Sequence, residues 1–227
     1  MKPAADRVSG PAKTGWSRYL ADLHVHTCLS VCAEPEMTPA AIVDTARSRG
    51  LSMIAICDHD ATGNCEPVSR ISGQDLCVIA GIEITIEDEK HVLGLFGSPV
   101  EAAAAQAQVV GQPGNRSTLA RAVAVIHEWR GLAIAAHVDR PASGILGRGG
   151  QISRGTGLDA FELSRNALGS QMHATLAALG FPLTTASDSH CLEDIGTCFS
   201  VLELPTASFS ELKLAIRGEQ GRRCSLA

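Results

Sequence analysis

Eight short apolar runs divide the chain from about residue 19 onward. They read YLADLHVH, LSMIAICDH, LCVIAGIEITI, HVLGLFG, LAIAAHV, LDAFELS, PLTTASDS and TCFSVLEL. Apolar residues fill these runs continuously and do not alternate with polar ones, which is typical of strands buried on both faces of a parallel sheet. Residues 1–18 lack such a run, so we expect a flexible tail there and a single domain over residues 19–227.

Helix-like segments with clear start and stop signals separate several of these runs. In MTPAAIVDTARSRG, Thr38 is the expected N-cap, Pro39 the first helical residue and Gly50 the stop. The segment STLARAVAVIHEWRG is expected to begin at Ser117 and end at Gly131, and ALGSQMHATLAALG and SFSELKLAIRG follow the same plan. Seven or eight strand–helix units predict an α/β fold, either a βα barrel or a doubly wound sheet.

Histidines and carboxylates gather at the ends of the apolar runs. The residues in question are His24, His26, Asp58, His59, Asp60, Glu83, His91, His137, Asp139, Asp188 and His190. The ends of the strands in α/β barrels and open α/β sheets come together to form sites, so these side chains are expected to converge. His127 and His173 fall inside helical segments and are expected to be ordinary helix residues.

The composition of this set predicts a metal site. His24 and His26 are two residues apart, so both would point to one face of their strand and bind one ion. In GIEITIEDEKHVLG, a tight turn centred near Glu87 would place Glu83 directly opposite His91, with Cβ atoms about 5 Å apart. Imidazole and carboxylate together suit Zn²⁺, Mn²⁺ or Fe²⁺, and a bridging carboxylate can hold two ions for phosphoester hydrolysis.

The ordered set DLHVHT, CDHD, GIEIT, HVLGLF, AAHVDRP and ASDSH resembles the PHP (polymerase and histidinol phosphatase) phosphoesterases, from Ala21 to about Leu204. This resemblance implies a distorted (β/α)7 barrel with two or three divalent metal ions at the C-terminal ends of its strands. It implies metal-dependent hydrolysis of phosphate esters. It also implies ligands for two ions: His24, His26 and Asp188 for the first, His91 and His137 for the second, and Glu83 as a bridge between them.

The same resemblance implies a third ion held by His59 and His190, with one more ligand from the loop TCLSVCAEPEMTPA. Glu34 lies four residues before the helix cap Thr38 and is the favoured ligand. Cys32 is the alternative, because a thiolate prefers Zn²⁺.

Our hypothesis for the reaction is an in-line attack on phosphorus by a hydroxide held between two metal ions, which lower the pKa of water toward neutrality. Arg140 and Arg165 are the candidates for binding phosphate oxygens, and a surface salt bridge is the alternative for each. Asp58 and Asp60 are expected to orient ligating histidines. The segment 140–157, which contains Arg148 and Arg154, is expected either to close over substrate or to be simply a flexible loop.

Composition narrows the choice of function. The net charge of −5 and the 4% aromatic content disfavour a nuclease acting on short oligonucleotides and favour a small phosphorylated metabolite or nucleotide as substrate. A metal-stabilised regulatory domain without turnover is the third possibility, disfavoured because a structural site needs fewer ligands.

No run is long enough for a membrane span and no secretory signal is present, so we expect a cytoplasmic protein with eight free thiols. The pattern predicts no oligomeric state.

Overall fold

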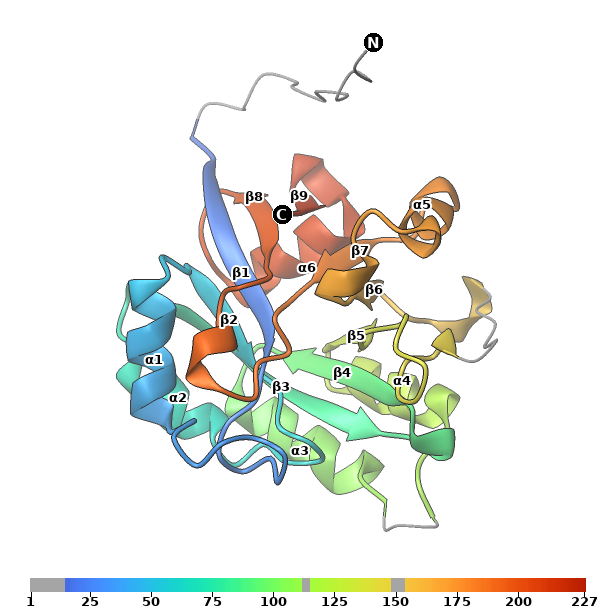
Figure 1. Cartoon of the computed structure of the whole chain (residues 1–227), viewed down its shortest axis with the longest axis horizontal. Helices are drawn as coiled ribbons and strands as arrows, with labels where there is room; N and C mark the ends of the chain where they lie inside the picture. The colour runs from blue at the N-terminus through green and yellow to red at the C-terminus, as the bar shows by residue number, and fades with distance from the viewer. Residues whose placement is uncertain (1–14, 112–114, 148–153) are drawn as a thin grey trace.

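In a computed structural model that describes residues 15–111, 115–147 and 154–227, the strands form one mixed sheet (Figure 1). Their order across the sheet is β7-β6-β5-β4-β3-β2-β1-β8-β9. The strands are β1 (Ser17–Val25), β2 (Met53–Ile56), β3 (Cys77–Thr85), β4 (His91–Phe96), β5 (Leu132–Ala135), β6 (Ala160–Leu163), β7 (Leu183–Thr185), β8 (Ser200–Leu204) and β9 (Arg223–Leu226). All eight predicted runs are strands, and β9 is an addition.

The direction of the strands decides which residues meet. Strands β1, β2 and β3 are parallel, and so are β5, β6 and β7, whereas β4 is antiparallel to both of its neighbours. The hairpin between β3 and β4 causes this reversal. The start of β4, where His91 lies, is therefore at the same edge of the sheet as the C-terminal ends of the parallel strands.

The sheet curves into a nearly closed barrel, which confirms the predicted fold class. The chain beyond β7 returns to β1: Ser189 forms a parallel bridge with Val25, and the Ser189 carbonyl accepts a hydrogen bond from the His26 N–H at 3.1 Å. Below this point the Ser200 hydroxyl joins β8 to β7, since it accepts from the Thr185 N–H and donates to the Thr185 carbonyl, each at 2.9 Å.

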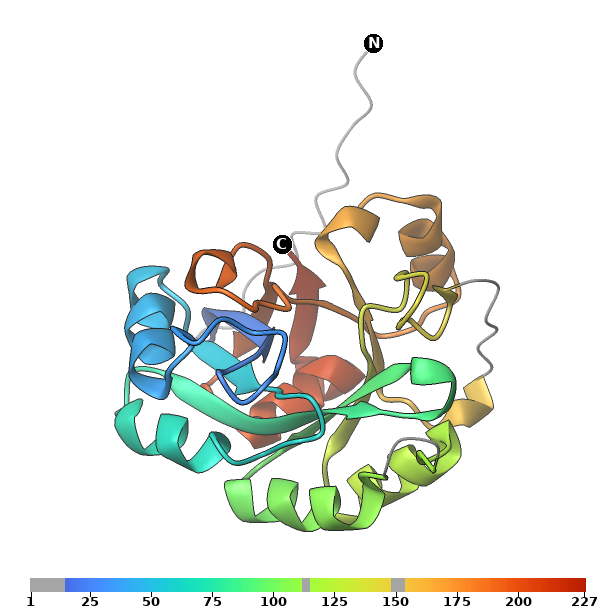
Figure 2. The same cartoon turned by 60° about the horizontal axis from the view of Figure 1, so that its bottom comes forward.

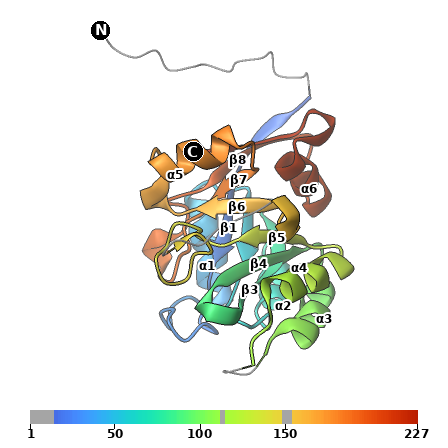
Figure 3. The same ribbon diagram turned by 90° about the vertical axis from the view of Figure 1, so that its right-hand side faces the viewer.

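Helices cover the outside of the barrel (Figures 2 and 3). They are α1 (Pro39–Ser48), α2 (Cys65–Ile71), α3 (Pro99–Val109), α4 (Leu119–Glu128), α5 (Gln171–Ala178) and α6 (Phe209–Arg217). The predicted signals of α1 are confirmed: Thr38 caps the helix, Pro39 opens it, and Gly50 follows it with a φ of 71°. Helix α4 is capped by Thr118, one residue after the expected Ser117.

Apolar side chains fill the fold in two main layers and a smaller cluster around β5, β6 and α5. One layer packs the outer face of the sheet against α1 to α4, and the other fills the barrel interior above α6. On β1, one extra residue lies between Asp22 and Val25 relative to β2. Leu23 packs in the inner layer and Val25 in the outer one, so His24 and His26, which flank Val25, face the interior.

The beginning of the domain differs slightly from the expectation. Ser17 and Arg18 already belong to β1 and pair with Leu204 and Glu203, so the strand starts two residues before position 19. Residues 1–14 of the predicted tail lie outside the described residues. All eight cysteines are free thiols, as predicted. None of the helices in the described ranges has the length and apolar character needed to cross a membrane.

Candidate metal centre

Eight predicted ligands lie together at one end of the barrel, although they come from six different segments. They are His24 and His26 on and after β1, His59 after β2, Glu83 on β3, His91 on β4, His137 after β5, and Asp188 and His190 after β7. The side chains of His24, His26, Glu83 and His137 are at most 2% exposed to solvent. Buried histidines and carboxylates do not serve apolar packing, so this cluster is a candidate ligand-binding site.

Glu83 lies at the centre of this group. Its Oε1 atom is 2.8 Å from Nδ1 of His91 and 2.9 Å from Nε2 of His137. Its Oε2 atom is 3.0 Å from Nδ1 of His59, 3.3 Å from Nε2 of His26 and 3.4 Å from Nε2 of His24. Each oxygen of one carboxylate therefore faces a different set of imidazoles, which is the arrangement of a carboxylate that bridges two ions.

The spacing of the buried set His24, His26, Glu83 and Asp188 fits a metal ion. The Nε2 atoms of His24 and His26 are 3.1 Å apart, and they lie 3.3 Å and 3.1 Å from Oδ1 of Asp188. Ligand atoms about 2.1 Å from one ion lie about 3.0–3.4 Å apart at octahedral and tetrahedral angles. The four groups thus have the separations of a coordination shell, and they belong to one group of metal-competent ligands.

Hydrogen bonds on the far side of each ring turn the free nitrogen toward the centre. Nδ1 of His24 is 3.0 Å from Oε1 of Glu162, and a carboxylate can only accept, so Nδ1 carries the proton. Nδ1 of His26 is 2.9 Å from the Ser30 hydroxyl, whose own proton goes to Asp58 at 2.6 Å. Both Nε2 atoms are therefore left with lone pairs that point at each other, as metal ligands require.

The electrostatics of the centre show how strongly its carboxylates and imidazoles interact with one another. Burial alone would raise the pKa of Glu83, but the charge of His24 and a hydrogen bond from His137 hold it well below its usual value. Burial would lower the pKa of His24, but the carboxylates of Asp188, Glu162 and Glu83 raise it well above the usual value. Oε2 of Glu83 is buried and has no hydrogen-bond partner among the described residues. The residues therefore fit divalent cations, which would satisfy this oxygen.

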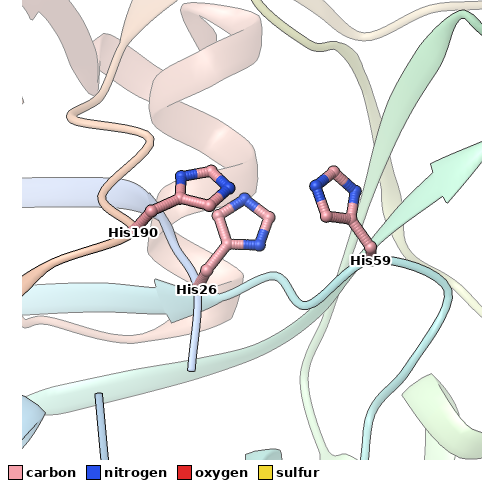
Figure 4. A group of neighbouring side chains, drawn as sticks. All are labelled: His26, His59 and His190. Atoms are coloured by element: carbon pink, nitrogen blue, oxygen red, sulfur yellow. The ribbon is translucent and has the colours of Figure 1, made fainter. Parts of the chain in front are cut away.

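Two further groups of neighbouring ligands adjoin the first. One consists of His59, Glu83 and His91, and the other of His26, His59 and His190. Figure 4 shows the second group: the rings of His26 and His190 stack with centroids 4.1 Å apart, and His59 faces them from the next strand. His59 thus belongs to both groups.

The predicted additional ligand of a third ion stays a prediction. Among the described residues, no metal-competent group includes Glu34 or Cys32. Glu34 is exposed, and its main-chain N–H donates to the His190 carbonyl at 2.8 Å. Partial burial and the charges of Glu83 and Asp188 raise the pKa of the Cys32 thiol, so this side chain lies within electrostatic range of the centre. Both residues are therefore on the loop that borders His190.

The hairpin was predicted, but its register was wrong. Glu83 pairs with Leu93, and His91 pairs with Thr85, so the two residues are diagonal and not opposite. The turn is centred on Asp88, where Asp88 and Glu89 adopt φ values of 57° and 54°. The two side chains still meet, because diagonal neighbours on the same face of a sheet are within reach of long side chains.

Comparison with known proteins identifies the family. A family model described as PHP domain matches residues 22–177, more than half of the chain, and a second described as PHP-associated matches residues 174–220. The chain belongs to the PHP family. The family predicted from the sequence motifs is thus confirmed.

The relatives of this PHP chain include named phosphoric ester hydrolases. A 3′,5′-nucleoside bisphosphate phosphatase from Chromobacterium violaceum is 30% identical over 83 residues, which make up 36% of this chain and 28% of that protein. The 5′-3′ exoribonuclease Rnm from Escherichia coli is 36% identical over 84 residues, which make up 35% of this chain and 27% of that protein. The aligned stretches thus span less than a third of each curated relative.

Solved structures show the same fold. A lesion-specific endonuclease from Pyrococcus furiosus matches with a TM-score of 0.75 at 20% identity, over 92% of this chain and 58% of that one. PsfC from Pseudomonas syringae matches with a TM-score of 0.62 at 16% identity, over 92% of both chains. At such identities the likeness concerns the PHP fold alone.

Asp58 orients a ligating histidine of the PHP site through hydrogen bonds, whereas Asp60 does not. The buried carboxylate of Asp58 accepts hydrogen bonds from the N–H and hydroxyl of Thr27, both at 2.7 Å, and from Ser30. Through Ser30 it fixes the ring of His26. Asp60 instead accepts from the Thr85 N–H at 2.9 Å and from Arg116 at 3.2 Å. The expectation that Asp60 orients a histidine was therefore wrong.

Arg140 and Arg165 line a cavity of about 400 Å³ beside the PHP centre, together with His137, Glu162 and Asp188. The Arg140 guanidinium forms an ion pair with Oδ2 of Asp188. The arginine predicted to bind phosphate therefore contacts a predicted metal ligand. The main chain of Arg140 is held in a tight coil, where its carbonyl accepts from the Gly144 N–H at 3.0 Å. Of the predicted 140–157 loop, residues 148–153, including Arg148, lie outside the described residues.

Sequence reasoning missed two residues that support the PHP ligands. Glu162 is 2% exposed, and besides His24 it binds the main-chain N–H of His137 at 3.1 Å. Ser143 lies 3.4 Å from Nδ1 of His137, and its carbonyl accepts from the His91 N–H at 3.0 Å. The only signal for Glu162 is a carboxylate inside an otherwise apolar strand.

His127 and His173 are helix residues outside the centre, as predicted: His127 bonds Asp159, and His173 caps a local turn at Gly169.

Proposed function

We propose that this PHP protein is a metal-dependent phosphoesterase that hydrolyses a small phosphorylated metabolite or nucleotide. Its proposed cofactors are two or three divalent ions, Mn²⁺, Zn²⁺ or Fe²⁺. His24, His26 and Asp188 hold the first ion, His91 and His137 the second, and Glu83 bridges the two. His59 and His190 hold a third, with Glu34 favoured over Cys32 as its remaining ligand.

The observation that carries this proposal is the division of Glu83 between two sets of imidazoles. Oε1 faces His91 and His137, whereas Oε2 faces the nitrogens of β1 and of His59. When bound, divalent ions supply the positive charge that activates water and offsets charge on a reacting phosphate. A purely structural metal site is closed and uses four ligands around one ion, so a shared carboxylate supports an enzyme over a scaffold.

The protein's own residues prepare the site in stated ways. Glu162 and Ser30 hold the imidazoles of His24 and His26 in the tautomer that leaves Nε2 free. Asp58 fixes Ser30 and the loop after β1. Arg165 carries no ion pair to any described residue and lies at the rim of the cavity, where a guanidinium would bind a phosphate oxygen. Arg140 would shift between Asp188 and the phosphate.

A small substrate is favoured over nucleic acid. The net charge of −5 opposes the approach of a polyanion, and the cavity of about 400 Å³ is of the size that accepts a small molecule. The names of the Escherichia coli exoribonuclease and the Pyrococcus furiosus endonuclease make nuclease activity on short oligonucleotides the second candidate. A cytoplasmic location is part of the proposal, because Mn²⁺ or Fe²⁺ chemistry and free thiols both suit a reducing compartment.

Metal reconstitution followed by a substrate panel tests the proposal. The protein is stripped with a chelator, loaded with Mn²⁺, Zn²⁺ or Fe²⁺, and assayed with p-nitrophenyl phosphate, its bis-ester and short oligonucleotides. A library of phosphorylated metabolites with phosphate detection follows. We expect metal-dependent release of phosphate from small esters. Turnover of oligonucleotides alone would favour the nuclease, and binding of metal without turnover of any ester would favour the regulatory domain.

A further inference from the structure

Glu162 on β6 has one oxygen with a defined task and one without. Oε1 is within 3.0 Å of Nδ1 of His24 and within 3.1 Å of the His137 main-chain N–H, so it is fully used in supporting two predicted ligands. Oε2 is buried, since the residue is only 2% exposed, and it has no hydrogen-bond partner among the residues that the structure describes. A buried carboxylate oxygen without a donor is costly, so its retention in the fold indicates that a donor arrives from outside the chain.

The place of this oxygen shows where such a donor would come from. Glu162 lines the cavity of about 400 Å³ that also borders His137 and Asp188 of the metal centre. A molecule whose phosphate lies between the metal centre and the two arginines would therefore extend its remaining part into the rest of this cavity. That part is the alcohol released when the phosphate ester is cleaved.

Other carboxylates of the cavity have partners among the described residues. Asp139 accepts from the main-chain N–H and the hydroxyl of Ser164 at 2.9 and 2.6 Å. Asp188 pairs with Arg140, and Asp194 accepts from the Cys191 thiol at 3.3 Å. Glu162 is thus the carboxylate that is left to recognise a ligand, and it can only do so by accepting a hydrogen bond.

We infer that the cavity is the pocket for the leaving alcohol and that Glu162 selects alcohols with a further hydroxyl group, such as a sugar or another polyol. This inference rests on the proposed phosphoesterase function and narrows its substrate class. A substrate hydroxyl donates to Oε2 of Glu162 and supplies the hydrogen bond that this oxygen lacks. An alkyl group in the same place leaves the carboxylate oxygen buried and unpaired, and sites of this kind strongly reject analogues that lack the hydroxyl.

Matched pairs of esters test the inference with the unaltered protein. Ribose 5-phosphate is compared with cyclopentylmethyl phosphate, and glycerol 1-phosphate with n-propyl phosphate, each with the metal-loaded enzyme. We expect kcat/KM to be at least about 100-fold higher for the hydroxylated member of at least one pair. Equal efficiency within both pairs would overturn the inference and leave the phosphoesterase standing. No turnover of any ester would overturn the phosphoesterase and the inference together.

Two variants separate recognition by Glu162 from its support of His24. In Glu162→Gln the amide oxygen can still accept from His24 and His137, but a donor replaces the free acceptor, so the preference for the hydroxylated ester should fall about 10-fold or more. Ser30→Ala is the control, because Ser30 supports His26 as Glu162 supports His24 but does not line the cavity. It should slow both esters by the same factor. An unchanged preference in Glu162→Gln, or an equal loss of preference in Ser30→Ala, would refute the role of Glu162 in selection.

Discussion

Oε1 of Glu83 lies 2.8 Å from Nδ1 of His91, although the two residues are two positions out of register across their hairpin. The reach of a glutamate makes this contact possible, and a shorter aspartate would not span the diagonal. Since Oε2 of the same carboxylate faces His59, His26 and His24, one side chain connects both halves of the proposed metal centre.

Glu83→Gln should therefore empty the centre while leaving the fold intact. The amide keeps the shape of the side chain but loses the charge shared by two ions, so metal content should drop sharply and activity at least about 100-fold. Elemental analysis and steady-state kinetics measure the two effects. Glu89→Gln, at the exposed tip of the same hairpin, is the matched control and should behave as wild type. Full activity of Glu83→Gln would exclude the two-metal model.

Arg140→Ala should weaken substrate binding without weakening metal binding. Arg140 places its positive charge on Asp188, and its removal makes that carboxylate a stronger ligand, so the affinity for Mn²⁺ should stay the same or rise. The Michaelis constant for a phosphate monoester should rise about 10-fold or more, because a guanidinium contact to phosphate is lost. Mn²⁺ titration and initial rates check both. A loss of metal with an unchanged Michaelis constant would show that Arg140 only positions Asp188.

Glu34→Ala should reduce the metal content by about one ion per chain. His59 and His190 are neutral ligands, so a third ion needs a negative group from the loop that borders them. Activity should fall but persist, because Glu83 and the ligands of the other two ions are unchanged. Elemental analysis of Glu34→Ala beside Cys32→Ser decides between the two ligands. Loss of one ion only in Cys32→Ser would reject Glu34, and no loss in either variant would leave a two-metal centre.

Asp159 should contribute fully to stability above about pH 4 and progressively less below it. Burial would raise its pKa, but hydrogen bonds from His127, the Ala133 N–H and Arg217 lower it below 3.8. A lowered folded-state pKa means that the unfolded chain takes up the proton first as the pH falls, so the stabilisation is complete above about pH 4 and is lost below it. Asp159→Asn should lower the free energy of unfolding by about 1.5–3 kcal/mol at pH 5.

Denaturant titrations of both proteins from pH 5 to pH 2, with a chelator present, measure this dependence. The gap between wild type and Asp159→Asn should close toward pH 2. A gap of constant size would show that the charge of Asp159 is irrelevant.

Much of the fold was predictable because buried strands need continuous apolar runs. The metal ligands were predictable because they are polar residues at the ends of these apolar runs. His24, His59 and His137 lie there, where a buried polar group is costly without a partner. Helix α3 carries the same signals as α1, with Ser98 as cap and Pro99 at its start, and was open to prediction. Strand β9 was not, because RCSL is short and half polar.

Other features depend on tertiary structure and leave no local mark. The hairpin register was misjudged because Asp88 and Glu89 adopt left-handed conformations in which glycine or asparagine is the usual residue. Glu162 reads as one polar residue in a strand, and its role appears only once the curved sheet brings its side chain to His24 of β1 and to the His137 main chain after β5. Likewise, the pairing of Arg140 with Asp188 joins segments that the sequence keeps apart.

The return of the chain from β7 to β1, where Ser189 meets Val25, has a consequence for how the barrel holds together. His26 and Asp188 are 162 positions apart in the sequence, and a shared ion would tie them like a cross-link. Closing so long a loop costs the chain much of its conformational freedom. Metal binding to the folded protein therefore offsets part of that cost, and the stabilisation grows with the logarithm of the ion concentration. Hydrogen exchange at the Val25–Ser189 junction should slow as the ion is added.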